Sequence, residues 1–435
     1  MIKRRAGTHE PRRPALPPLS ERAHSVRLGP WHVIVLDTPI QSVVSFQGSF
    51  CTYPDFAAGE IVLQELVVAL LDKGTHRRDR FQIAEELENR GAQLSFSSDG
   101  LRVRFSGRAL PEDLDMVMEI VAEQLREPRI GADEFDKARA YVAASLRREM
   151  ESTGAQAGAA LSRLMYPRTH PNFSMQPEEA MAALRSYSVE QVRAFHQEHF
   201  SPARGVVVVV GDLRSVAVDE IVGRSLSDWV ESEGEIDVAA AAMEYEANRA
   251  TVPLAEKANS DVRLGHPLRL LRSDEDFIPL YVGNYVLGGN FSGRLMTIIR
   301  DRMGLTYGIW SNLGGVTTDY SGHWAAGITL SKDNVERGTE ATRTEMKRFV
   351  LEGIESAELE DAQTTIAGAF QVGLATTGGL ASTLLQNAER GFDVAYLDRF
   401  PEMVRSLHVD RVNDVLRRHL DPDRLSLAIC GELPA

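Results

Sequence analysis

Cysteine is nearly absent from this chain, which has only Cys51 and Cys430 among its 435 residues. Two cysteines this far apart fit neither a disulfide framework nor a zinc site built from cysteine ligands, because both need more cysteines at closer spacing. Each lies beside a run of apolar residues. We therefore expect two buried, structural thiols.

Long hydrophobic segments are absent too. No stretch reaches the roughly 18 apolar residues of a membrane-spanning helix, and residues 1–28 are basic and proline-rich, without the apolar block of a signal peptide. These absences predict a cytoplasmic protein that does not enter a membrane and that starts with a flexible arm over 1–28. An arginine-rich organellar presequence is the alternative for this arm, and its acidic residues Glu10 and Glu21 disfavour it.

Basic residues are in the minority, since 48 Lys and Arg stand against 62 Asp and Glu, a net charge of −14. Such a surface repels a phosphate backbone, so we expect no nucleic-acid partner, whereas cationic peptides are compatible with it. Two catalytic signatures are also missing. The chain has no G-x-S-x-G nucleophile elbow, and its glycine-rich segment GGNFSGR lacks the G-K-[ST] ending of a phosphate-binding loop.

An internal repeat is the clearest positive feature. Residues 184–213 and 404–433 align without a gap, and both predict a helix, a proline turn and an apolar strand that ends in Gly-Asp or Gly-Glu. A second pair of similar segments begins at Glu134 and Glu358, at nearly the same offset. Most of the chain therefore consists of two copies of one unit.

The repeat and the chain length together define the domains. A chain of this length is too long for one ordinary core, so we predict two domains of about 200 residues each. The acidic, alanine-rich stretch 227–248 lies between the copies and is the natural linker. The N-terminal domain is then 29–226 and the C-terminal domain 249–435.

The first copy shows the order of elements that we expect in both. Alternating apolar residues around Asp99-Gly100 indicate a hairpin, and apolar stripes indicate helices. The expected elements are strands within 25–39 and 42–54, a helix over 58–72, a hairpin over 91–109, and helices over 112–127 and 133–151. This order predicts an α+β fold, an antiparallel sheet with helices packed on one face.

The helix over 58–72 carries the most informative pattern. Its sequence EIVLQELVVALLDKGT resembles the H-x-x-E-H helix of the pitrilysin/insulinase family of zinc peptidases, the inverzincins, which continues into a Lys-Gly-Thr turn. The resemblance places the family's two histidines at Glu65 and Ala69 and its general-base glutamate at Val68. A catalytic zinc needs three protein ligands and an open position for water, and neither valine nor alanine can ligate it.

The third zinc ligand of the family is also replaced. It is a glutamate on a later helix, and matching that helix to FDKARAYVAASLRREM places it at Ser145, with an accompanying glutamate at Ala138. Glu65 is thus the one carboxylate at these positions. We expect no metal or other cofactor in this chain and a helix that is simply buried by its apolar residues, namely Ile61, Val62, Leu66, Val67, Leu70 and Leu71.

The second copy keeps a different part of the family pattern. Residues 281–311 resemble LGG-x-x-x-S-R-L-x-x-x-L-R-x-x-x-G-L-x-Y-x-x-x-S, in which an arginine and a tyrosine reach across to the zinc site, contact the substrate and help to stabilise the tetrahedral intermediate. Arg300 and Tyr307 match that pair. A guanidinium and a phenolic hydroxyl are both donors that can meet the oxyanion formed in peptide hydrolysis.

Further positions are candidates for substrate binding. Gly288 and Gly289 suit a tight turn where backbone comes close to a ligand or a neighbour. Arg294 is expected to serve the loop or an inter-domain contact rather than catalysis. Gln93 and Ser95 lie on the strand that in active relatives binds an extended peptide by strand addition.

Three histidines look like metal ligands but have simpler explanations. His196 and His199 are three residues apart, whereas the family's histidines are four apart, and the first of them is replaced by Leu416 in the second copy. His323 alternates with apolar residues along an expected strand. We interpret all three as structural.

The resemblance implies two homologous α/β-roll domains that form a clamshell, and a zinc-free subunit of a two-chain peptidase. An H-x-x-E-H partner would hold the zinc, and this chain would supply Arg300 and Tyr307 for the hydrolysis of peptides. A catalytically inactive scaffold or a peptide-binding protein of the same fold is the main alternative. A hydrolase that uses unrelated residues is a third.

Overall fold

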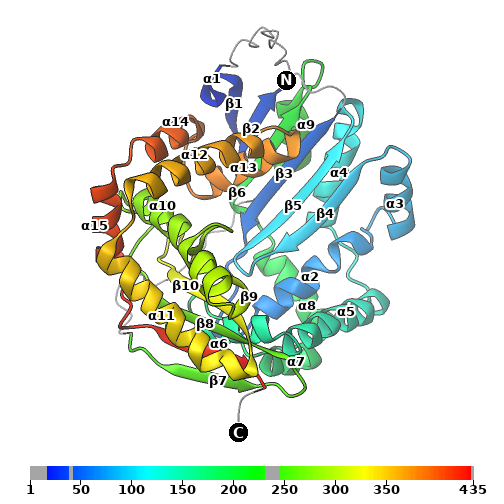
Figure 1. Ribbon diagram of the computed structural model, residues 1–435. Coiled ribbons are helices and arrows are strands. Elements are labelled where there is room, and N and C mark those ends of the chain that lie inside the picture. Colours follow the sequence, from blue (N-terminus) through cyan, green and yellow to red (C-terminus); the bar gives the residue numbers. More distant parts are fainter. Residues whose placement is uncertain (1–16, 39–42, 231–244, 433–435) are drawn as a thin grey trace, which may run out of the picture.

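Two β-sheets, one in each half of the chain, organise the computed structural model, which describes residues 17–38, 43–230 and 245–432 (Figure 1). The strands of the first sheet lie in the order β1 (Ala23–Leu28), β2 (Trp31–Asp37), β6 (Ala203–Gly211), β3 (Val44–Cys51), β5 (Arg102–Ala109) and β4 (Gln93–Ser98). The order in the second sheet is β7 (Arg249–Pro253), β11 (Ser426–Gly431), β8 (Asn259–Pro267), β10 (His323–Ser331) and β9 (Thr306–Gly314).

The predicted antiparallel pairing holds with one exception in each sheet. β6 is parallel to β2, and β11 is parallel to β7. In both halves the last strand follows the helical segment in the sequence and lies in the sheet between two strands that precede that segment. A central strand is buried on both faces and therefore reads as a continuous apolar run, which is what the valines 206–210 of β6 provide.

The helices of the first half follow the predicted order with additions. They are α1 (Leu19–Arg22), α2 (Ile61–Val68), α3 (Arg80–Glu88), α4 (Leu114–Arg126), α5 (Ala132–Met150), α6 (Thr153–Met165), α7 (Pro177–Ser186), α8 (Val189–His199) and α9 (Val218–Leu226). The helix expected over 58–72 is shorter, because Gly59 and Gly74 adopt positive φ at its two sides and Leu71–Lys73 form a separate 3₁₀ turn. The hairpin of β4 and β5 is confirmed, with Ser95 opposite Ser106.

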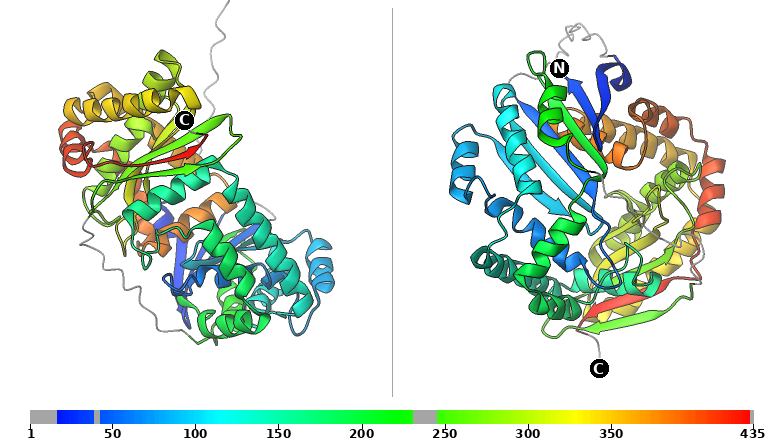
Figure 2. Two further views of the ribbon diagram at one scale, coloured as in Figure 1. Left: turned by 90° about the horizontal axis from the view of Figure 1, so that it is seen from below. Right: turned by 180° about the vertical axis from the view of Figure 1, so that it is seen from behind.

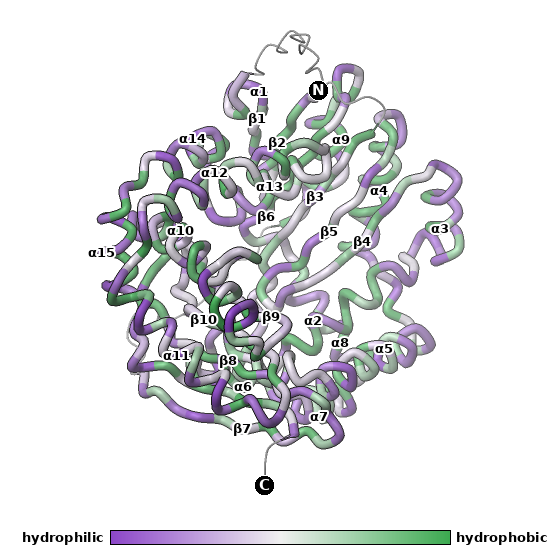
Figure 3. Tube along the Cα trace, viewed as in Figure 1, coloured by the Kyte–Doolittle hydropathy of each residue, from purple (hydrophilic) through white to green (hydrophobic). Residues whose placement is uncertain are grey.

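The second half repeats this design. Its helices are α10 (Phe277–Gly288), α11 (Val335–Glu352), α12 (Ser356–Gly373), α13 (Thr377–Glu389), α14 (Val394–Arg405) and α15 (Val409–His419), together with the π-helical segment η3 (Met296–Arg302). α8 with β6 and α15 with β11 are the segments that the sequence repeat paired, so two copies of one unit are confirmed. Figure 3 shows polar and apolar residues alternating along outer helices such as α3 and α15.

The arm predicted over 1–28 is structured in its described part. α1 begins at Leu19, whose backbone N–H donates to Asp398 Oδ1 at 2.7 Å, and β1 pairs with β2 along its whole length. A strand that is hydrogen-bonded to a sheet belongs to the domain, so the first domain begins before residue 29. Residues 1–16 and most of the predicted linker, 231–244, lie outside the described residues.

Each sheet is covered on one face by its own helices and on the other by a helix from the opposite half (Figures 1 and 2). α13 lies on β6 and β3 of the first sheet, where Leu380 and Leu384 pack against Ile34 and Val208. α6 lies on β11 and β8 of the second sheet. The prediction of helices on one face therefore describes only half of the packing.

The absence of membrane-spanning helices and the burial of the two cysteines are the features that the composition had predicted. Within the described residues, no helix is both long enough and apolar enough to cross a bilayer. Cys51 and Cys430 are buried, free thiols on β3 and β11, as expected.

The shared packing makes the stability of the first sheet depend on α13. Leu384 is fully buried against the first sheet, so we expect Leu384→Ala to lower the free energy of unfolding by about 2–5 kcal/mol. Urea denaturation measures this change. Leu351→Ala is the matched control, because that leucine lies on α11 and is 80% exposed. Equal effects of the two substitutions would contradict the packing role of α13.

Candidate functional site

The positions that the resemblance assigns to zinc chemistry meet in one cavity of about 800 Å³ between α2, α5 and β4. Glu65, Val68 and Ala69 project from α2, where residues three and four apart share a face. Ser145 and Ala138 approach from α5. We call this space the α2/α5 cavity. The opposite face of α2 is packed into the core through Val62, Leu66 and Val67, as the sequence predicted.

The donors in this cavity do not fit a catalytic zinc. At the positions that the resemblance assigns, Val68 and Ala69 offer no ligand atom, which leaves the Glu65 carboxylate and the Ser145 hydroxyl. The other carboxylates that line the cavity, those of Asp72, Glu134 and Glu149, are not at the family's ligand positions. No group of three or more His, Cys, Asp or Glu residues that could hold a metal occurs in the described part of the chain. The positions that the resemblance assigns to zinc chemistry therefore line one cavity, but the residues at those positions do not form a zinc-binding set.

Glu65 is electrostatically unusual. Burial, and to a lesser extent the charge of Glu149, raises the pKa of the Glu65 carboxyl to about 7. The positively charged residues of the cavity pair with carboxylates other than Glu65: Lys73 with Asp72, and both Lys137 and Arg80 with Glu134. A carboxyl in this environment is partly protonated at neutral pH, which is a poor state for a metal ligand.

Arg300 and Tyr307 lie in the other half and do not line the α2/α5 cavity. Arg300 belongs to η3, and its guanidinium carbon stands 4.7 Å from the centroid of the Phe291 ring. Tyr307, near the start of β9, is 97% exposed. Tyr307 is thus open to solvent, whereas the Arg300 side chain is only 33% exposed. π-helical turns are rare and frequently mark functional sites.

The glycines of this segment have a packing role. A Cβ on Gly288 would come within 2.8 Å of Ser311 Oγ, and one on Gly289 within 2.7 Å of Tyr285 Cα. Real Cβ atoms do not come so close to other atoms, so Gly288 is required where α10 meets β9, and Gly289 where the chain lies against the last turn of α10. The close approach that the sequence suggested is therefore to other parts of the chain.

Arg294 is committed to contacts inside the second half. It donates two hydrogen bonds to the Glu358 carboxylate, at 2.7 and 2.6 Å, and a third to the Gly353 carbonyl at 2.8 Å. Its guanidinium also lies over the Phe349 ring. Arg294 therefore anchors the loop before η3, and it makes no inter-domain contact among the described residues.

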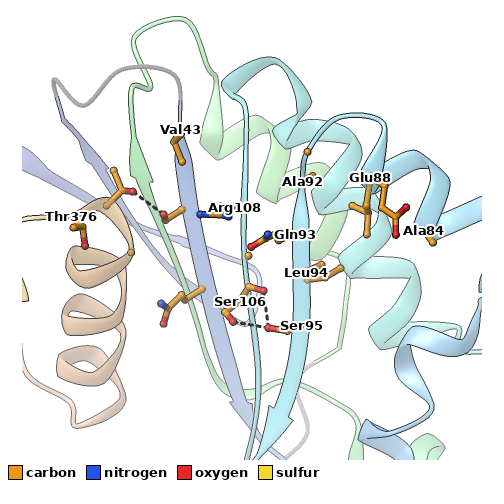
Figure 4. A pocket seen from close by; sticks show the side chains of 17 residues that line it. Val43, Ala84, Glu88, Ala92, Gln93, Leu94, Ser95, Ser106, Arg108 and Thr376 are labelled. Atoms are coloured by element: carbon orange, nitrogen blue, oxygen red, sulfur yellow. Dashed lines mark hydrogen bonds between the residues drawn. The ribbon is translucent and has the colours of Figure 1, made fainter.

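Gln93 and Ser95 lie on β4, which is an edge strand of the first sheet. They line a second cavity of about 990 Å³, together with Ser106 and Arg108 of β5 and Thr376 before α13 (Figure 4). Ser95 lines the α2/α5 cavity as well. The exposed edge of β4 therefore connects two hollow regions, an arrangement in which an added peptide strand would have room for its side chains.

The three histidines that look like metal ligands in the sequence each have a hydrogen-bond partner within the fold. His196 Nε2 lies 2.8 Å from the Leu125 carbonyl, and His199 Nδ1 lies 3.0 Å from the Thr52 carbonyl. His323 Nδ1 is hydrogen-bonded to the hydroxyl of Tyr166 at 2.8 Å, and burial lowers the pKa of His323 to about 4. Sequence reasoning identified all three as structural, but it did not find Tyr166 as a contact between the halves.

Comparison with known proteins identifies the family. A model described as Insulinase (Peptidase family M16) matches residues 65–169, and a model described as Peptidase M16 inactive domain matches residues 186–366. The chain belongs to peptidase family M16. The resemblance to the pitrilysin/insulinase peptidases is thereby confirmed.

Curated M16 relatives include proteins described as peptidases and as non-peptidases. An uncharacterized zinc protease of Streptomyces coelicolor is 23% identical over 373 residues, which cover 84% of this chain and 79% of that protein. A non-peptidase homologue of Helicobacter pylori is 21% identical over 374 residues, covering 85% of this chain and 84% of its own. Membership of M16 alone therefore leaves activity open.

Solved structures confirm the fold. A peptidase M16 inactive domain from Pseudomonas fluorescens has a TM-score of 0.83 at 20% identity, covering 95% of this chain and 99% of that chain. A protease from Helicobacter pylori has a TM-score of 0.82 at 16% identity, covering 94% and 99%. At such identities the comparison establishes the α+β clamshell-type architecture.

The raised pKa of Glu65 has a measurable consequence. Between its ordinary value of 4.5 and about 7, the native carboxyl holds a proton that the unfolded carboxyl has lost. Stability contributed by this group is therefore present at low pH and is lost as the pH rises towards 7, by on the order of 2 kcal/mol. We expect Glu65→Gln to reduce the loss of stability between pH 5 and pH 8, measured by urea denaturation at each pH.

Glu149→Gln is the companion variant for this prediction. It removes the neighbouring charge while it leaves Glu65 in place, so the pKa of Glu65 should move down, as followed by NMR titration of the side-chain carboxyl carbon. An unchanged pH dependence of stability in Glu65→Gln would show that Glu65 is not the group responsible.

Proposed function

We propose that this chain is the zinc-free subunit of a two-chain M16 peptidase. A homologous partner with an intact H-x-x-E-H helix holds the zinc, activates the water and supplies the general base. This chain closes the chamber and contributes Arg300 and Tyr307 to the partner's site. The complex then requires the zinc that the partner binds, and this chain binds no cofactor.

The observation that carries the proposal is the contrast between the two halves. In the α2/α5 cavity, Ala69 and Ser145 stand at two of the assigned ligand positions and Val68 at the position of the general base, so the cavity lacks both a zinc-binding set and a base. Arg300 and Tyr307 are nevertheless present in the second half, where Tyr307 is 97% exposed and Arg300 is partly exposed. Because the chain's own cavity cannot use these two donors, a second chain is the natural place for them.

The chemistry of the pair suits a peptide-bond transition state. A guanidinium is always charged and a phenolic hydroxyl is neutral, so together they donate to the oxyanion without taking up a proton at physiological pH. Donors that are directed in advance at developing negative charge are among the largest contributions to catalysis. In this division of labour the partner activates the nucleophile and this chain stabilises the charge.

Peptide binding without catalysis is the second candidate. The exposed edge of β4 and the two cavities beside it support it, because an extended peptide can hydrogen-bond to such an edge. A pure scaffold or binding protein has no use for Arg300 and Tyr307, whereas a peptidase subunit needs both. The two candidates therefore differ in whether these side chains affect turnover.

The decisive experiment combines this chain with an H-x-x-E-H homologue from the same genome. With a quenched fluorescent peptide as substrate, we expect cleavage by the complex, loss of cleavage on addition of a chelator, and no cleavage by this chain alone. Chelator-sensitive cleavage by the isolated chain would refute the proposal, and so would a failure of the two chains to associate.

Substitution of the pair tests its role. Removing one preorganised donor typically costs about 10²–10³ in kcat, so we expect Arg300→Ala to lower turnover of the complex to that extent and Tyr307→Phe to lower it as well. Arg302→Ala is the matched control, since that arginine ends the same segment and has no assigned role. Unchanged turnover in Arg300→Ala would refute the cross-subunit role and favour the binding protein.

A further inference from the structure

Phe291 has a large aromatic side chain that is exposed to solvent instead of being packed in a hydrophobic core. It lies in the turn between α10 and η3, and it is 70% exposed. Its ring lies beneath the Arg300 guanidinium, with the carbon of that group 4.7 Å from the ring centroid. This distance is within the range of an attractive cation–π contact.

The turn that carries Phe291 is fixed by hydrogen bonds on both sides of the ring. Asn290 Nδ2 donates to the Tyr285 carbonyl at 2.7 Å, and Asn290 Oδ1 accepts from the Ser292 backbone N–H at 2.8 Å and from its hydroxyl at 2.7 Å. Gly293 then packs against Gly288. The ring is therefore presented from a defined backbone position and can serve as a platform.

Arg300 has little else to hold it. Among the described residues the carboxylate paired with it is that of Asp301, its neighbour in the chain, at 3.8 Å, which is a long and solvent-exposed contact. An arginine side chain has about 2 kcal/mol of rotamer entropy to lose when it is fixed in one direction. Among the described residues, the Phe291 ring is thus the aromatic face that lies against the Arg300 guanidinium.

Arg294, six residues earlier, also lies over an aromatic ring, that of Phe349, but hydrogen bonds hold it as well. Its donors are used by the Glu358 carboxylate and by a backbone carbonyl. Such an arginine is well fixed, but its charge is neutralised and its donors are occupied. An aromatic face alone holds the guanidinium by its plane and leaves the N–H groups, which lie in that plane, free to donate.

Building on the function proposed above, we propose that Phe291 is a positioning residue for Arg300. Its ring holds the guanidinium in a fixed direction with the charge and the donors still available to a substrate bound at the partner's zinc. Phe291 itself touches neither the substrate nor the metal. It acts by preorganisation, which lowers the barrier only when the donor is used.

The experiment uses the complex with the H-x-x-E-H partner and a quenched fluorescent peptide. We expect Phe291→Leu to lower kcat and kcat/KM equally, by about two- to fivefold, the size of an exposed cation–π contact. Phe291→Trp should retain turnover, because it keeps an aromatic face. Phe81→Leu is the matched control, an exposed phenylalanine on α3 with the Arg80 guanidinium 4.6 Å from its ring centroid.

A double-mutant cycle separates positioning from a general structural effect. If Phe291 acts through Arg300, then Phe291→Leu has no further effect in the Arg300→Ala background. Additive losses would overturn the proposal and leave the proposed function standing. Unchanged turnover in the single variant Arg300→Ala would instead refute the proposed function.

Two further measurements keep the proposal falsifiable. Subunit affinity, measured by analytical ultracentrifugation, should be the same in Phe291→Leu and in the unaltered chain. Weakened association with normal kcat at saturating partner would make Phe291 an interface anchor and overturn the proposal. In the free chain, NMR of labelled arginine should show a ring-current shift of the Arg300 side-chain resonances. This shift should be lost in Phe291→Leu and kept in Phe291→Trp. Absence of the shift in the unaltered chain would also overturn the proposal.

Discussion

The exchange of helices between the two halves is the constraint on which this structure depends. α13 covers the second face of the first sheet, and α6 covers the second face of the second sheet. Each half therefore contributes one helix to the hydrophobic core of the other half. Polar contacts fix both helices in place. Arg104 of β5 is bidentate to Glu389 at the end of α13, and Thr153 of α6 donates to Asp261 of β8 at 2.7 Å. The halves therefore form one unit and hold the α2/α5 cavity and η3 in a fixed relation.

Within this rigid unit the two halves differ in the kind of chemistry they retain. In the first half, the positions that the resemblance assigns to zinc chemistry line one cavity, and Glu65 is the one carboxyl among them. The second half keeps donors suited to negative charge on a segment whose glycines and Arg294 hold it in shape. Retaining a costly π-helical turn and exposed aromatic side chains is difficult to explain by stability alone.

The sequence was informative wherever local pattern decides structure. Alternation around Asp99-Gly100 predicted the β4–β5 hairpin, and the repeat predicted α8 with β6 and α15 with β11, because these features depend on neighbouring residues. The family resemblance also placed Glu65, Ala69 and Ser145 at one site, and they do line one cavity. The exchanged helices and the parallel insertion of β6 depend on contacts between distant segments, for which periodicity carries no signal. The contact of Arg300 with Phe291 is local, but it depends on the geometry of a turn that periodicity does not specify.

The cover that α13 provides also sets an order for folding. β6, the last strand of the first sheet, ends at Gly211, whereas α13 begins at Thr377. During synthesis the first sheet is therefore complete long before the helix that shields its second face is made. An apolar surface that includes Ile34, Leu36 and Val208 then stays open to solvent or to other chains. A fragment that ends after the first half would keep this surface permanently, so the natural unit of folding and of expression is the pair of halves.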